Sequence, residues 1–73
     1  MQVRRTTNSL TQVEFSTYTA EVIEREPKHW YFTIYDGLGQ KYYCSLDDGC
    51  NTYYDEKEAL AKLRKYMLDR DLL

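Results

Sequence analysis

The chain has 73 residues, a formal net charge of −2 at neutral pH and 15% aromatic residues. This length allows one domain at most, with a marginal core that large aromatic rings can strengthen, and the acidic balance argues against a strong sequence-independent grip on nucleic acid. The sequence contains no apolar run long enough to span a membrane and no secretory signal, so we expect a cytoplasmic protein without a membrane partner.

The first nine residues are polar and basic. Residues 1–9 are therefore expected to form a flexible N-terminal arm ahead of a single domain that covers residues 10–73. Arg4 and Arg5 of this arm are candidate contacts for an anionic partner.

The next segment, residues 10–24, is dense in β-branched and aromatic residues and predicts a strand. Its apolar alternation changes phase, because Val13 and Phe15 share one parity whereas Tyr18 and Ala20 share the other. One flat strand cannot place both sets on the same face. Either a bulge near Ser16–Thr17 or a short separate N-terminal strand would resolve the conflict.

Two further strands follow, joined by the hairpin signal "DGLGQ" at residues 36–40. Strict alternation predicts one face made of Trp30, Phe32, Ile34, Tyr42, Cys44 and Leu46. It predicts an opposite face made of Tyr31, Thr33, Tyr35, Lys41, Tyr43 and Ser45. The segment "CNTYY", residues 50–54, is either a fourth short strand or a loop.

After Asp55 the apolar period changes from 2 to 3.6, which predicts a C-terminal helix that ends near Asp69. Asp55 and Glu58 have the spacing of a capping box. The apolar stripe of this helix consists of Ala59, Leu60, Leu63, Tyr66 and Met67. The sequence therefore predicts a two-layer α+β domain in which a three-stranded, or alternatively four-stranded, antiparallel sheet packs against one helix (βββα).

No residue set in the sequence predicts catalysis, a metal site or a cofactor. The single histidine, His29, lies in a turn, and the carboxylates at residues 47, 48 and 55 are explained by turns and helix capping. Cys44 and Cys50 have no zinc-type spacing, and two reduced thiols are favoured over a disulfide in a cytoplasmic chain. We therefore expect a protein that is not an enzyme.

One helix can cover only one face of the sheet, so the opposite face should expose tyrosines. The candidate partner-binding residues are Tyr31, Thr33, Tyr35, Lys41 and Tyr43. Exposed aromatic side chains of this kind, or an edge strand, suit a small regulatory module that binds a protein partner or a second copy of itself. The other interpretation is that these tyrosines only stabilise the sheet, above all if the N-terminal segment folds over them.

The alternative function is nucleic-acid binding through the sheet or a basic helix face. The pattern "W…YDGLGQ…EALAKL" resembles, in outline, the arm-site DNA-binding domains of phage integrases, and this resemblance implies a sheet that enters the major groove. The candidate contacts for an anionic partner on the helix are Lys57, Lys62, Arg64 and Lys65. On the strands only Lys41 is basic near the middle of the sheet, whereas a groove-reading sheet normally carries several basic residues.

Overall fold

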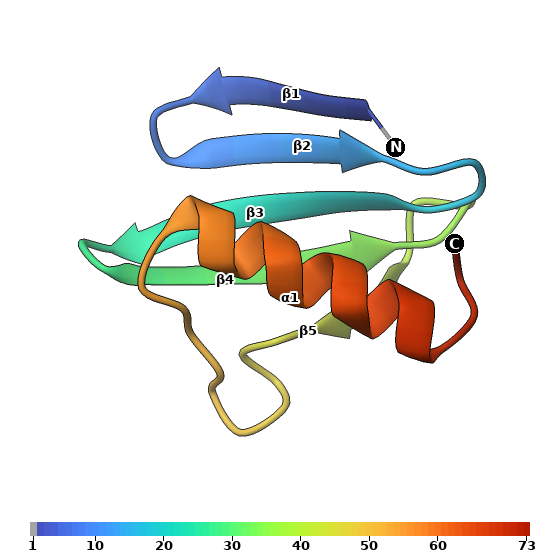
Figure 1. Ribbon diagram of the computed structural model, residues 1–73. Helices are drawn as coiled ribbons and strands as arrows, with labels where there is room; N and C mark the ends of the chain where they lie inside the picture. Colours follow the sequence, from blue (N-terminus) through green and yellow to red (C-terminus); the bar gives the residue numbers. More distant parts are fainter. Residues whose placement is uncertain (1) are drawn as a thin grey trace.

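The computed structural model describes residues 2–73, so Met1, the first residue of the expected arm, lies outside the described residues. The elements in chain order are β1 (Gln2–Thr7), β2 (Leu10–Glu14), β3 (Thr19–Glu26), β4 (His29–Tyr35), β5 (Lys41–Cys44) and α1 (Glu56–Asp69). The five strands form one antiparallel meander in sequence order, and α1 packs across β3 and β4 on one face (Figure 1). The predicted α+β class and C-terminal helix are confirmed, but the sheet has five strands rather than three or four.

One additional strand is β1, where the sequence predicts a flexible arm. Residues 2–7 instead pair with β2 from Gln2–Glu14 at one end to Thr7–Leu10 at the other. A tight turn joins the two strands, and its Ser9 amide donates a hydrogen bond to Thr7 Oγ1 at 3.1 Å. Backbone pairing in this hairpin therefore places the N-terminal residues in the sheet.

The phase change between residues 10 and 24 marks a boundary between two strands. β2 ends at Glu14 and β3 begins at Thr19, so the separate-strand alternative is confirmed and the bulge within one strand is wrong. The Phe15 amide donates to the Tyr18 carbonyl at 2.9 Å and closes the turn. Because the chain reverses here, Val13 and Ala20 become cross-strand neighbours on the same face.

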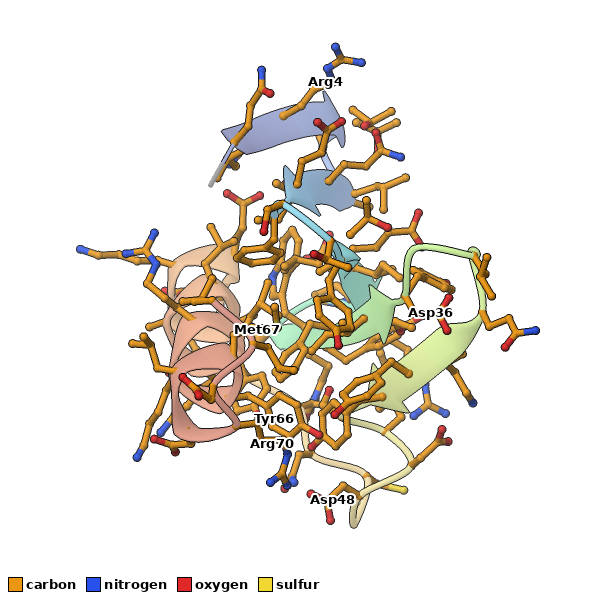
Figure 2. The ribbon with its side chains drawn as sticks, turned by 90° about the vertical axis from the view of Figure 1, so that its right-hand side faces the viewer. Arg4, Asp36, Asp48, Tyr66, Met67 and Arg70 are labelled. Carbon is orange, nitrogen blue, oxygen red and sulfur yellow. The ribbon has the colours of Figure 1, made fainter. Side chains whose placement is uncertain are left out.

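The helix begins where its capping residue predicts. The Asp55 side chain accepts a hydrogen bond from the Glu58 amide at 2.8 Å and so satisfies one of the free amides of the first turn. Three stripe residues, Ala59, Leu63 and Met67, are buried against the sheet, and Figure 2 shows Met67 between the helix and the strands. No helix among residues 2–73 is long and apolar enough to cross a membrane.

The main cluster of the hydrophobic core lies between α1 and one face of the sheet. Its buried members are Val13, Ala20, Val22, Trp30, Phe32, Ile34, Ala59, Leu63 and Met67. The segment between β5 and α1 runs beside β4, where Trp30 and Tyr53 exchange both backbone hydrogen bonds at 2.8 and 2.7 Å. Residues 50–54 thus contribute an isolated bridge and not a fourth regular strand.

Candidate functional site

The face of the sheet opposite α1, here called the outer face, carries three rows of side chains across the strands. Cross-strand pairing gives the rows Leu10–Ile23–Tyr31, Arg4–Gln12–Glu21–Thr33–Cys44 and Gln2–Glu14–Thr19–Tyr35–Lys41. Figure 1 shows α1 on the other face, and residues 2–73 form no second layer on this one. Tyr31, Thr33 and Tyr35 therefore lie on the outer face, as the alternation of β4 predicts.

Tyr43 does not lie on the outer face, and the predicted alternation of β5 is wrong. Ile34 pairs with Tyr43 and Tyr35 pairs with Lys41, so Tyr42 is an extra residue in a bulge. One inserted residue reverses the parity of all the residues beyond it. Cys44 consequently lies beside Thr33 on the outer face, where Thr33 Oγ1 donates to its Sγ at 3.3 Å.

Tyr43 instead belongs to an aromatic cluster on the helix side. Its ring stacks on Tyr66 of α1 with 4.0 Å between centroids, and it contacts Phe32 at 5.7 Å. Arg70 lies over the Tyr66 ring at 4.4 Å, and the Tyr43 hydroxyl donates to Asp48 at 3.0 Å. Figure 2 shows Tyr66, Arg70 and Asp48 gathered at one end of the molecule. Burial and, second, the bond to Asp48 raise the pKa of Tyr43, so its hydroxyl stays protonated.

The ring at position 42 is the tyrosine of β5 that solvent reaches. Tyr42 is 46% exposed and meets Tyr18 edge to face with 5.5 Å between ring centroids. Ser45, another residue whose predicted face is reversed by the bulge, is buried, and its Oγ accepts a hydrogen bond from the Phe32 amide at 3.2 Å. The side chains of this segment therefore contact the protein itself, which favours a structural role for β5 over a role in docking.

The side chains of the outer face are less exposed to solvent than the sequence predicts. Thr33 is only 5% exposed, and Tyr31 and Tyr35 are half-buried by their row neighbours. The Tyr35 hydroxyl donates to Glu21 at 3.1 Å, and burial followed by this bond raises the pKa of Tyr35. Lys41, at the end of the row, forms an exposed ion pair with Asp47 at 2.7 Å.

An open hollow of about 340 Å³ lies on the outer face over β2 and β3. Its polar lining consists of Gln12, Glu14, Thr19, Glu21 and Tyr35. Because its tyrosine is a neutral hydrogen-bond donor and its charged groups are carboxylates, this hollow suits polar contact.

The most accessible element is β1, at the free edge of the sheet. All six of its residues are exposed, and within residues 2–73 only β2 pairs with it. Sequence reasoning missed this strand, although the β-branched residues of "VRRTT" and the following Asn8–Ser9 turn carry a signal for it. The charges of Arg4 and Arg5 instead indicate, from the sequence alone, that this segment is a flexible arm in solvent.

The two arginines of β1 have different surroundings. Arg5 points to the helix side, where its guanidinium donates to Glu56 at 2.6 Å; Thr11 donates to the same carboxylate at 2.7 Å. Arg4 points to the outer face and has no hydrogen-bond or ion-pair partner in the described part of the chain. Figure 2 shows the Arg4 side chain at the free edge, directed away from the body of the molecule.

The basic residues of α1 do not form one patch with a single orientation. Lys57, Lys62, Arg64 and Lys65 are all exposed. At 100° per residue, Lys57 and Arg64 share one flank, whereas Lys62 lies on the other. Lys65 is near Asp69, with 3.5 Å between Nζ and the carboxylate.

The groups that could bind a metal or react are dispersed. Across residues 2–73 the structure brings together no set of three histidine, cysteine or acidic side chains that could hold a metal ion. Cys44 is a buried free thiol and Cys50 is an exposed one. His29 Nδ1 lies 3.3 Å from Thr52 Oγ1 in the turn before β4.

Comparisons with known proteins provide no relative. No protein-family model matches this chain. Neither a curated protein nor a solved structure matches it significantly.

Proposed function

We propose that this chain is a non-enzymatic protein-interaction module that docks a protein partner along the free β1 edge of its sheet. The observation that carries the proposal is that β1 is a six-residue edge strand whose residues are all exposed. An edge strand presents unpaired backbone amides and carbonyls, and an extended segment of another protein can pair with them.

The opposite edge of the sheet is a poorer template for strand addition. β5 has only four residues, and the bulge at Tyr42 interrupts its regular pairing. Bulges and short lengths are devices by which proteins protect sheet edges from further pairing. In β1 the register shifts only between Arg5 and Thr7, which leaves residues 2–5 regular.

The outer face supplies a second contact surface, three strands in from this edge. Tyr31 and Tyr35 lie half-buried there on β4, and a partner strand at β1 would add one residue to rows of the same face. Tyrosine rings provide contact area at little entropic cost. Of the tyrosines proposed for partner binding, Tyr31 and Tyr35 remain on this surface, and Tyr43 is assigned to the core instead.

The same geometry gives less support to nucleic-acid binding. Arg5 and Lys65 each face an acidic neighbour, the basic residues of α1 lie on different flanks, and the net charge is −2. A nucleic-acid surface depends on cations that converge on one track of phosphates. Protein docking therefore stays the preferred proposal.

Site-specific photo-crosslinking in the cells that produce the chain tests the proposal. A benzophenone side chain is placed at Thr6 in β1 and, as the matched control, at Ala61 on the exposed face of α1. A crosslink to a protein from position 6 and not from position 61 supports docking at the edge, whether that protein is another chain or a second copy. Crosslinks from position 61 alone, from neither position, or to nucleic acid would overturn it.

A further inference from the structure

We infer that β1 accepts an extended peptide segment that places an acidic side chain opposite Arg4 and an apolar side chain opposite Val3. This inference rests on the proposed docking at the edge and specifies the chemistry of the partner. It follows from the two faces of β1, which favour different side chains on an added strand.

The regular part of β1 fixes which side chains an added strand would meet. Residues 2–5 pair one to one with residues 14–11 of β2, and the register shifts only after Arg5. Successive side chains alternate between faces, so Gln2 and Arg4 project on the outer face and Val3 and Arg5 on the helix side. A sixth strand would extend each of these rows by one residue.

On the helix side, an apolar row runs across the sheet and ends at an exposed residue. Val3 pairs with Val13, Val13 with Ala20, and Ala20 with Ile34. The three inner residues are at most 1% exposed, whereas Val3 is 47% exposed. An apolar side chain opposite Val3 would bury Val3 and complete the row. Such burial is favourable because it removes apolar surface from water.

On the outer face, a negatively charged side chain of the added strand is favoured. Arg4 is exposed and unpartnered among the described residues, and its row continues to Gln12 and Glu21. Opposite charges across neighbouring strands stabilise the pairing. An acid opposite Arg5 would gain less, because Arg5 already binds Glu56 and the two carboxylates would repel each other.

A second copy of the chain is a less favourable occupant of this edge, because its β1 strand places no acidic side chain opposite Arg4. In an antiparallel pair of β1 strands centred on Arg4, the two guanidinium groups lie directly opposite each other. In a pair centred on Val3, each Arg4 lies opposite Gln2 and diagonal to the other Arg4. Like charges directly opposite one another destabilise the first arrangement, and the second leaves Arg4 without an opposite charge, so an acidic partner strand is the preferred occupant.

Peptide titrations followed by amide chemical shifts of the full chain test this inference. The probe is an acetylated eight-residue threonine peptide that contains one adjacent glutamate–valine pair. Matched peptides replace the glutamate by glutamine or lysine, and another carries N-methyl groups on alternate backbone amides to block strand pairing. We expect shifts at residues 2–7, an affinity about two- to fivefold higher for glutamate than for glutamine, weakest binding for lysine and none for the N-methylated peptide.

Charge reversal at the edge provides the specific control. Arg4→Glu should invert the preference between the glutamate and lysine peptides. Arg25→Glu, the same substitution at an exposed position on β3 two strands away from the edge, should leave it unchanged. Both substitutions change the net charge equally, so only a local contact distinguishes them.

The outcomes distinguish the preference for an acidic partner from docking by strand addition itself. Equal binding of the glutamate and lysine peptides at β1 would overturn the acidic preference and leave docking by strand addition intact. If no peptide shifts the amides of residues 2–7, the inference and strand addition at this edge both fail. Concentration-dependent broadening of these amides without peptide would identify a second copy as the occupant and overturn the acidic partner.

Discussion

Replacing Tyr43 by serine should destabilise the protein more than the same replacement of Tyr31. Tyr43 stacks on Tyr66 at 4.0 Å and lies 5.7 Å from Phe32, so its ring joins β5 to α1 and β4. Tyr31 lies half-buried on the outer face, where no layer covers it. Alternation alone places both rings on one face and predicts similar effects.

The size of the Tyr43 effect follows from buried area and ring contacts. A half-buried tyrosine ring removes about 100 Å² from water, which at about 25 cal/mol/Å² contributes about 2.5 kcal/mol. Each of the two ring pairs adds about 0.5–1.5 kcal/mol. We expect Tyr43→Ser to lower the free energy of unfolding by about 3.5–5.5 kcal/mol. Tyr31→Ser removes a ring of similar burial without these two ring pairs, so we expect a loss of about 2.5 kcal/mol or less.

Urea denaturation followed by circular dichroism measures these differences. A chain of this size has about 4–11 kcal/mol of stability in total, so Tyr43→Ser should lose much of its folded population. Tyr43→Phe keeps the ring and removes only the bond to Asp48, which should cost about 1 kcal/mol. Equal losses for Tyr43→Ser and Tyr31→Ser would refute the assignment of Tyr43 to the core.

Three further predictions follow from local contacts. Asp55→Ala removes the cap of α1 and should lower the free energy of unfolding by about 1 kcal/mol in the same denaturation assay; an unchanged midpoint would show that water replaces the cap. Arg5→Gln breaks the ion pair with Glu56 and should speed hydrogen exchange of β1 amides by up to about fivefold, whereas unchanged exchange would mean that the pair does not hold the strand. Burial and the bond to Asp48 raise the pKa of Tyr43 above the ordinary value of about 10, so the folded state holds this proton more tightly than the unfolded state. Its contribution to stability is complete below about pH 10 and declines as the pH rises, and Tyr43→Phe should flatten that decline; the same slope in both proteins would contradict the prediction.

The elements with local sequence signals could be predicted from the sequence alone. The period of 3.6 and the capping pair at Asp55 and Glu58 located α1, and strict alternation located β4 with Phe32 and Ile34 toward the helix. The phase change after Val13 indicated a break that the structure shows as the turn between β2 and β3. In each case neighbouring residues alone specify the backbone geometry.

The candidate site was predicted only in part. Tyr31, Thr33 and Tyr35 lie on the outer face because β4 pairs regularly with β3 from residue 30 to residue 35. The edge strand with Arg4 was absent from the prediction, since its polar, charged sequence carries no apolar alternation.

Two features could not be predicted without the folded arrangement of the chain: residues 2–7 form a strand, and Tyr43 points to the helix. β1 exists because its backbone pairs with β2, an interaction to which its exposed side chains contribute little. The side of Tyr43 depends on one bulged residue, Tyr42, and a bulge is set by how two strands align and not by the residues of one strand. Strand pairing and register are relations between segments, so they appear only when the segments are brought together.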